Sequence, residues 1–216
     1  MITLFPEMFE PVLGSSMMWK AQKDQKAEFQ LINLRDYGLG PRRQVDDKPF
    51  GGGAGMLLMI EPLTKAIEQA RQILPRAKVL LMTPAKTVWD QKRAQLHAKN
   101  DDDYIIVCGR YEGFDARVEG LVDEKISVGR YVLTGGELPA MIVIDSIVRL
   151  LPGVLGGGDE ATAIESYSQL DALEYPQYTR PEEYEGKRVP KVLLSGNHAL
   201  IGKWRREHQI DLSADS

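Results

Sequence analysis

The sequence predicts an α/β fold in which helices cover both faces of a parallel sheet. Two continuous apolar runs, residues 77–82 (AKVLLM) and 104–108 (YIIVC), have the composition of fully buried strands. They alternate with two segments of helical periodicity, residues 88–98 and 139–151, and this alternation is typical of parallel sheets. The chain has 216 residues, of which 43% are hydrophobic and 27% charged, the balance of a globular protein with a sizeable core.

The other expected elements are shorter. They are strands at residues 2–5, 29–34 and 125–128, a helix at 61–74, a short helix at 117–121 and an amphipathic segment that begins near residue 6. Pro62 suits the first turn of the helix at 61–74. Residues 37–55 contain GLGPRR, VDDKP and GGGAG, and this polar, turn-rich stretch is longer than an ordinary connector. Long loops of this kind are often functional.

Glycine is unusually dense in the stretch KISVGRYVLTGGELPAM, which begins at Lys125. An expected strand breaks at Gly129, a second apolar run follows, and that run breaks at Gly135 and Gly136 just before a helix start. Because glycine has no Cβ, its backbone can approach another group closely or adopt positive φ. The pattern predicts that the backbone here comes very close to something else.

Three of the expected strand ends carry unusual residues, at 83–84 (TP), 109–113 (GRYEG) and 129–136. Ligands of open α/β sheets bind outside the carboxyl ends of the strands, so these loops predict one ligand site. The chain has no G-x-x-x-x-G-K-[ST] motif, and no expected strand is followed by G-x-G-x-x-G. This argues against a P-loop NTPase and against a dinucleotide-binding protein. Glycines that serve only tight turns are the alternative for any single loop.

A second region follows a break in composition at residues 153–163 (GVLGGGDEATA), which have the character of a flexible linker. Residues 175–216 are rich in Pro and Tyr and then become basic. Ser195 is expected to cap a helix. The exposed face of that helix would carry Lys203, Arg205 and Arg206.

The net charge of −4 argues against a protein that coats nucleic acid non-specifically. The basic residues are nevertheless clustered, which fits either local phosphate contacts or an ordinary solvated surface. The clusters are Arg42 with Arg43, Lys86 with Lys92 and Arg93, Lys187 with Arg188 and Lys191, and Lys203 with Arg205 and Arg206.

The sequence predicts a cytoplasmic protein that does not cross a membrane. No apolar run approaches the roughly 18 residues of a membrane span, and MITLFPEMFE lacks the basic start of a signal peptide. Cys108 is the only cysteine, so no internal disulfide is expected. No cluster has metal-ligand spacing, which argues against a structural zinc. His97 and His208 are expected to be ordinary surface residues.

Four long motifs together resemble one family. VDDKPFGGGAGMLLM, VCGRYEGFDARV, SVGRYVLTGGELPAM and YTRPEEYEG followed by VPKVLLSGNH are similar to the bacterial tRNA (guanine-N1)-methyltransferases, the TrmD family of the SPOUT class. The similarity runs from LFPEMF at Leu4 to KWR at Lys203, in the family's order. It implies methylation of guanine N1 at position 37 of tRNA, next to the anticodon, by a homodimer that uses S-adenosylmethionine.

The resemblance also implies a domain organisation that periodicity does not show. A SPOUT-type domain with a deep trefoil knot at its carboxyl end is expected at residues 1–152. A flexible linker at 153–164 would join it to a small, mainly helical tRNA-binding domain at 165–216. In the family, the knot holds S-adenosylmethionine in a bent conformation. Adenine needs an apolar slot with a few backbone donors and acceptors, which glycine-rich loops supply.

The residues that match the family's cofactor site come from the three strand ends. They are Met82, Thr83, Pro84, Gly109, Tyr111, Glu112, Val128, Gly129, Arg130, Tyr131, Val132, Leu133, Gly135, Gly136 and Pro139. Glu112 also matches an acid that the family links to dependence on Mg²⁺. Its alternative role is that of a carboxylate that accepts N–H bonds within its loop.

The residues that match the family's tRNA-binding positions lie in two motifs. They are Asp46, Lys48, Pro49, Gly51, Gly52, Gly53 and Gly55 in the loop that shapes the target-guanine pocket, and His198 in SGNH. His198 is expected to support tRNA binding and not to catalyse.

Methylation of guanine N1 requires a base for the ring proton and a positive group for the charge that moves toward O6. The resemblance assigns the positive group to Arg149, whose alternative is an arginine that snorkels from an apolar helix. It assigns the base to Glu165, where the family usually has aspartate. The segment SQLDALEYP is one residue longer than the family pattern, so Asp171 is a second, weaker candidate.

Two departures keep other readings open. Family members usually continue past K-W-R into a basic helical segment, whereas this chain ends in DLSADS, so some phosphate contacts are expected to be lost. The short tail and the presence of Glu165 in place of aspartate keep one alternative open. It is an RNA-binding protein that has kept the fold and the cofactor pocket but has lost turnover. A SPOUT enzyme that acts on ribose or on rRNA is disfavoured by the family-specific loop at 45–56.

Overall fold

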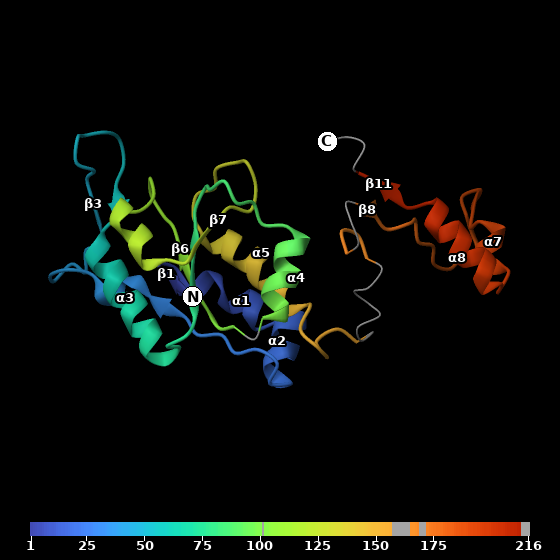
Figure 1. The fold of residues 1–216 in the computed structure, drawn as a ribbon, viewed down its shortest axis with the longest axis horizontal. Helices are drawn as coiled ribbons and strands as arrows, with labels where there is room; N and C mark the ends of the chain where they lie inside the picture. Colours follow the sequence, from blue (N-terminus) through green and yellow to red (C-terminus); the bar gives the residue numbers. More distant parts are fainter. Residues whose placement is uncertain (101, 157–164, 169–171, 213–216) are drawn as a thin grey trace. The chain divides into compact units, whose positions relative to one another are not determined.

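The computed structural model describes residues 1–100, 102–156, 165–168 and 172–212 (Figure 1). They belong to two compact units, Met1–Gly156 and Gly157–Ser216. Residues 153–156 of the expected linker belong to the first unit, and residues 157–164 lie outside the described residues. No helix in the described part of the chain is long and apolar enough to cross a membrane.

The first unit is built on a five-stranded sheet in the order β2-β1-β6-β5-β7, and every pairing in it is parallel. This confirms the predicted parallel α/β fold. The strands are β1 (Ile2–Thr3), β2 (Ile32–Asn33), β5 (Lys78–Met82), β6 (Tyr104–Cys108) and β7 (Glu124–Ile126). Beside them, β3 (Asp46–Asp47) and β4 (Leu57–Leu58) form an antiparallel hairpin.

Both faces of the sheet are buried, because alternate residues of the central strands enter two separate cores. Val79 and Leu81 of β5 belong to one core, and Leu80 and Met82 belong to the other. The first core is covered by α3 (Ile60–Ile73) and the 3₁₀ helices η2 (Leu34–Tyr37) and η3 (Ala116–Leu121). The second is covered by α1 (Glu10–Leu13), α2 (Ser16–Lys23), α4 (Gln91–Lys99) and α5 (Glu137–Val148), on the other side of the sheet in Figure 1.

Three strands are shorter than predicted, and at two of them side chains compete with the sheet for backbone groups. The Thr3 hydroxyl accepts the Phe5 N–H at 3.0 Å, and the 3₁₀ helix η1 (Pro6–Met8) follows, so β1 ends at Thr3. After β7, the Ser127 hydroxyl donates to the Gly129 carbonyl at 2.7 Å and begins a turn. β2 covers only the end of the predicted strand at 29–34.

The helix predicted at 88–98 begins later, at Gln91. The Asp90 carboxylate accepts the Arg93 N–H at 2.8 Å and caps α4. Trp89 lies before the helix, and its backbone N–H donates to the Ser127 carbonyl at 2.7 Å. Helix α5 begins two residues before the predicted start at Pro139.

The second unit has no buried residue in its described part. Its elements are β8 (Ala172–Leu173), β9 (Glu183–Tyr184), β10 (Lys187–Arg188), α7 (Lys191–Leu194), α8 (His198–Glu207) and β11 (Ile210–Asp211). Trp204 is the centre of a small aromatic cluster, stacked on His208 with ring centroids 4.1 Å apart. The cap predicted at Ser195 is wrong, because the Asn197 side chain accepts the first N–H groups of α8, while the Ser195 hydroxyl accepts the N–H of Asn197.

His97 is not a surface residue, as the sequence suggested, but is 3% exposed between the rings of Trp89 and Tyr104. Its Nε2 lies 3.7 Å from a Glu124 oxygen, and its Nδ1 has no hydrogen-bond partner in the described part of the chain. Burial lowers the pKa of His97, and this outweighs the attraction of the Glu124 carboxylate. The two rings that bury His97 lie outside α4, so the periodicity of the helix alone did not reveal the burial.

The buried histidine predicts loss of stability in mild acid. The unfolded chain takes up a proton near the ordinary pKa of 6.5 and the folded chain only at lower pH, so the stability contributed by neutral His97 falls as the pH drops below that value. Urea unfolding at pH 7.5 and 5.5 should therefore show a smaller loss for His97→Phe than for the wild type. Equal losses in both proteins would contradict this account.

Candidate functional site

Two cavities of the first unit lie at opposite ends of the sheet. The larger, of about 470 Å³, lies at the amino ends of the strands and is lined mainly by apolar side chains. The smaller, of about 180 Å³, lies at the carboxyl ends, where the motif loops meet. The smaller one is the candidate active site, because it is the one that the chemically unusual residues line.

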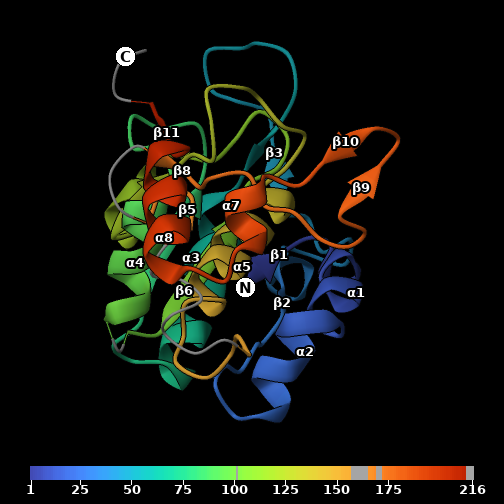
Figure 2. The same cartoon turned by 90° about the vertical axis from the view of Figure 1, so that its right-hand side faces the viewer.

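The three motif loops extend from the same end of the sheet, and Figures 1 and 2 both show this for the segments at 109–113 and 128–136. Backbone hydrogen bonds hold their bases together. The Thr83 N–H donates to the Ile126 carbonyl at 3.0 Å, and the Gly136 N–H donates to the Gly109 carbonyl at 2.8 Å. The ends of β5, β6 and β7 are therefore joined around the cavity.

Nearly all the residues that match the family's cofactor site line this one cavity, and Arg130 is the exception. Sequence reasoning missed six lining residues, namely Arg110, Gly113, Phe114, Ile126, Ser127 and Thr134. All six lie inside two of the quoted stretches, VCGRYEGFDARV and KISVGRYVLTGGELPAM, so these stretches were the signal that could have found them.

Two glycines are needed for close approach and not for positive φ. A Cβ on Gly136 would lie 2.5 Å from the Gly109 nitrogen and 2.7 Å from the Cys108 Cα, so the two backbones touch there. A Cβ on Gly135 would lie 2.5 Å from both Arg110 Nε and Glu137 Oε2. Neither residue has a positive φ. The backbone contact expected from the sequence is thus a contact of the chain with itself.

Glu137 is a fully buried carboxylate, 1% exposed, in the first turn of α5. It accepts hydrogen bonds from the Thr3 hydroxyl at 2.8 Å and from Arg110 Nε at 3.1 Å. Arg110 also donates to the Thr134 carbonyl at 3.3 Å and lies over the Phe5 ring, 4.4 Å from its centroid. A buried charge is tolerated only when it is paired, and the start of a helix favours an anion. This network joins β1, β6, the glycine-rich loop and α5.

Cys108 lies at the floor of the same region but is not a nucleophile. Burial, and then the nearby Glu137 carboxylate, raise the pKa of its thiol far above the ordinary value. The thiolate is the reactive form, so this cysteine stays inert near neutral pH.

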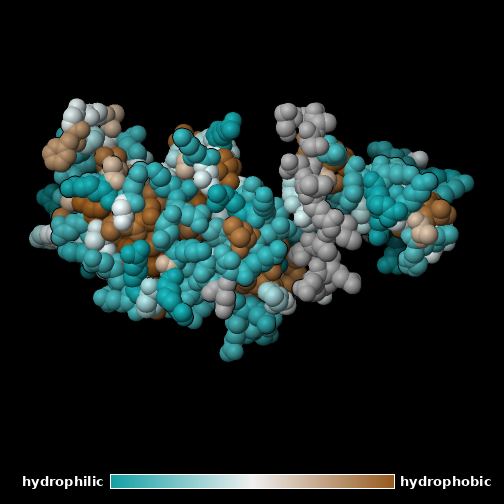
Figure 3. Space-filling model, viewed as in Figure 1, coloured by the Kyte–Doolittle hydropathy of each residue, from teal (hydrophilic) through white to brown (hydrophobic). Residues whose placement is uncertain are grey.

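Lys48, Pro49 and Gly51 to Gly55 lie at the tip of the β3–β4 hairpin, and Asp46 lies in β3 itself. Four glycines of this tip, Gly51, Gly52, Gly53 and Gly55, have positive φ, which other residues rarely adopt. Phe50 is fully exposed at this tip, and the loop stands clear of the unit in Figure 3.

The base of this hairpin is bonded to the cavity loop. The Glu112 N–H donates to the Met56 carbonyl at 3.0 Å, and the Leu58 N–H donates to the Gly113 carbonyl at 2.9 Å. The Glu112 side chain also packs against Gly55, where a Cβ would collide with it. The expected guanine-binding loop and the expected cofactor cavity are therefore adjacent and share Glu112.

The first unit does not bring Arg149 to the cavity. The cavity contacts the first turn of α5, while Arg149 is the C-cap residue at the opposite end. A helix of 12 residues is about 18 Å long, so Arg149 lies about that far from the end of α5 that contacts the cavity.

The other catalytic and tRNA-binding candidates belong to the second unit. Glu165 begins a tight turn in which Ser168 donates to its carbonyl through both its N–H, at 3.0 Å, and its hydroxyl, at 2.5 Å. His198 is the exposed first residue of α8. Asp171 lies outside the described residues.

Comparison with known proteins gives a consistent result. The tRNA (guanine-N(1)-)-methyltransferase of Bacillus subtilis is 49% identical over 211 residues, which cover 97% of this chain and 86% of that protein. The enzyme of the same name from Syntrophotalea carbinolica is 49% identical over 209 residues, covering 97% and 83%. A crystal structure described as tRNA (m1G37) methyltransferase from Aquifex aeolicus superposes with a TM-score of 0.77 and 39% identity, covering 96% of this chain and 86% of that one.

The model of one family, tRNA (Guanine-1)-methyltransferase TrmD, matches residues 1–215. Together with these relatives, that match shows that the chain belongs to the TrmD family of tRNA (guanine-1)-methyltransferases.

Proposed function

We propose that this protein transfers a methyl group from S-adenosylmethionine to N1 of guanine 37 in tRNA, in the cytoplasm. The observation that carries the proposal is the cavity at the carboxyl ends of β5, β6 and β7, formed by the three loops that resemble the family's cofactor site. The names of the relatives support the reaction, and the Aquifex aeolicus protein, described as an m1G37 methyltransferase, supports the position.

The same loops support a trefoil knot at the carboxyl end of the first domain. The knot would be formed by the chain after CGRYEG together with SVGRYVLTGGE. Contact between the backbones at Gly136 and Gly109, with no side chain between them, is the close packing that such a threaded arrangement requires.

S-adenosylmethionine fits this cavity if the Tyr131 ring moves away from Gly129. Met82, Pro84 and Leu133 offer apolar surface beside the glycine backbone, as adenine requires. However, about 180 Å³ is below the 300 Å³ or so of a typical ligand cavity, and the Tyr131 ring packs on Gly129. That ring is 56% exposed and its hydroxyl makes one long bond, 3.3 Å to the Val128 carbonyl. Rotation of Tyr131 away from Gly129 would enlarge the cavity at little cost.

The bound cofactor would supply a sulfonium methyl group. As guanine N1 acquires the methyl, the Glu165 carboxylate accepts the N1 proton, and the Arg149 guanidinium stabilises the negative charge at O6. Glu112 is the acid that lines the cavity in the described structure. It would contribute to a Mg²⁺ site only together with tRNA or cofactor oxygens, as Mg²⁺ commonly requires. The described residues contain no group of three potential ligands.

A homodimer would bring an arginine to the cavity although Arg149 of the same subunit lies at the far end of α5. The exposed side of α5 carries Leu138 and Ile142, which are 53% and 47% exposed, together with the exposed Asp145. Apolar residues spaced four apart form a stripe that a second helix can cover. If two α5 helices pair antiparallel across a twofold axis, Arg149 of the partner subunit comes to the cavity of the first.

The proposed activity predicts one product. Incubation of unmethylated tRNA with labelled S-adenosylmethionine should give N1-methylguanine immediately 3′ of the anticodon, located by mass spectrometry of nuclease fragments. A methyl group on ribose or on another base would contradict the proposal, and tRNA binding without any transfer would favour the RNA-binding alternative.

Alanine should have different effects at Gly129 and Gly136, because the added Cβ would meet a side chain at the first position and backbone at the second. In Gly129→Ala the three atoms nearest to the new Cβ all belong to the movable Tyr131 ring, so folding should survive. The methyl group would still occupy space that the cofactor needs beside the Gly129 backbone, so S-adenosylmethionine should bind about tenfold more weakly. In Gly136→Ala it meets backbone, so the protein should lose about 1–3 kcal/mol of stability. Thermal unfolding and calorimetric titration of both variants measure this, and a fully stable Gly136→Ala would contradict the backbone contact.

Glu165 is predicted to be the base. Glu165→Gln keeps the shape of the side chain but cannot accept a proton, so single-turnover methylation should slow about 10²–10⁴-fold while cofactor affinity stays unchanged. Glu165→Asp should retain activity. The matched control is Asp171→Asn, which should be close to wild type, and the opposite ranking of these two variants would transfer the role to Asp171.

A further inference from the structure

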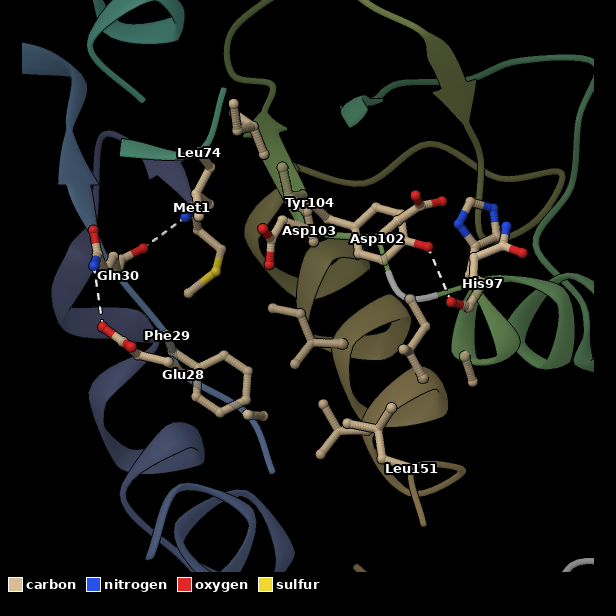
Figure 4. A pocket seen from close by; sticks show the side chains of 18 of the residues that line it. Met1, Glu28, Phe29, Gln30, Leu74, His97, Asp102, Asp103, Tyr104 and Leu151 are labelled. Carbon is tan, nitrogen blue, oxygen red and sulfur yellow. Dashed lines mark hydrogen bonds between the residues drawn. The ribbon is translucent and has the colours of Figure 1, made fainter. Parts of the chain in front are cut away.

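Phe50 is held in solvent by the fold of its own loop. It is fully exposed, more than any other large hydrophobic residue in the described part of the chain. The rings of Tyr104 and His97, by contrast, pack together at the larger cavity, where the Tyr104 hydroxyl donates to the His97 carbonyl at 3.0 Å (Figure 4). The Phe50 ring has no such shelter, although contact with water is unfavourable for an apolar group.

A tight turn fixes the backbone that carries this ring. The Gly52 N–H donates to the Pro49 carbonyl at 3.3 Å, and Gly51, at the third position of the turn, has a φ of +86°. These are features of a type II turn, which needs glycine or asparagine there. A Cβ built on Gly53 would lie 3.9 Å from Pro49 Cγ, so the loop folds back on itself. Because the turn is already formed, little ordering is required when the ring meets a partner.

The turn is attached to the candidate active site. Glu112, which lines that cavity, donates its N–H to the Met56 carbonyl at 3.0 Å, and its side chain packs against Gly55. Phe50 is five residues from Gly55, a span of at most about 18 Å even for an extended chain. The ring can therefore reach a nucleotide that neighbours the one whose base enters the cavity.

Methyl transfer to N1 requires the target guanine to leave its stack. N1 lies on the pairing edge of the base, and enzymes that modify a base take it out of the stack at the cost of the stacking that it loses. When the guanine leaves, one face of the neighbouring base is exposed to water. An aromatic side chain can cover such a face, and Lys48, which is exposed two residues before Phe50, offers a cation for a phosphate group.

We propose that Phe50 stacks on a nucleobase beside the target guanine and occupies the place that the guanine leaves. This inference rests on the proposed function, because it needs a tRNA whose guanine enters the cavity. The ring takes no part in the transfer of the proton or of the methyl group. It stabilises the tRNA with the guanine turned out, and since every base has a π face, the contact tolerates any base at that position.

Side chains of different shape at position 50 test the stacking. The affinity of the full chain for tRNA is measured by fluorescence anisotropy with S-adenosylhomocysteine, the demethylated cofactor, so that no turnover occurs. Phe50→Ala should bind about 10- to 100-fold more weakly, the usual effect of losing one base–aromatic stack, and so should Phe50→Leu, which is apolar but not flat. Phe50→Trp should bind like the wild type. The matched control is Trp19→Ala, which removes a half-exposed ring from α2 and should leave the affinity unchanged.

A second measurement identifies the partner of the ring. Two tRNAs are used, each lacking the base on one side of the target guanine. With one of them the wild type should lose affinity and Phe50→Ala should lose no more, because a double-mutant cycle counts a shared contact once. Equal affinity of Phe50→Ala and the wild type for intact tRNA would overturn the proposal, and so would an undiminished effect of Phe50→Ala with both abasic tRNAs.

Two further outcomes separate this proposal from others. A change in the oligomeric state of Phe50→Ala on sedimentation, with unchanged tRNA affinity, would overturn the proposal and assign the ring to a subunit interface. If the wild type binds tRNA and the cycle gives the expected result, but no methyl group is transferred, the stacking contact stands and only the proposed activity fails.

Discussion

In the first unit, the loops at the carboxyl ends of the strands are organised around one buried negative charge, the carboxylate of Glu137. A carboxylate that is 1% exposed is stable only if its partners are held in place, and Glu137 draws those partners from β1 and from the loop after β6. Through Arg110, the same charge also fixes the carbonyl of Thr134 in the glycine-rich loop. The cavity walls therefore depend on an ion pair between Arg110, which lines the cavity, and Glu137, which is buried beside it.

This constraint explains the order of residues in the motif Gly135-Gly136-Glu137. The acid must enter the first turn of α5, where the helix start favours a negative charge. The residue before it must leave the backbone of β6 free to approach, and the residue before that must leave space for the guanidinium. Each glycine is thus required by a different neighbour, and the two positions are not interchangeable.

The sequence predicted most of the first unit because its strands are buried on both faces, and an apolar run such as Val79 to Met82 is typical of a strand in that setting. It predicted the convergence of the loops because parallel strands end on one edge. It missed the burial of His97, because that depends on the rings of Trp89 and Tyr104 and not on local pattern. It placed the cap of α8 at Ser195 and not at Asn197, because Ser and Asn are both preferred at that position and the local pattern does not choose between them. It also could not show that α5 separates Arg149 from the cavity, because motif order carries no information about distance.

The absence of buried residues from the described part of the second unit bears on how such a protein changes over evolutionary time. In the first unit, a substitution on β5 or β6 disturbs one of two cores, and selection for folding removes it. At the described residues of the second unit, all of which are at least partly exposed, most substitutions leave folding untouched and are selected by what the surface contacts. The two units of this chain are therefore under different kinds of selection, one set by packing and the other by recognition.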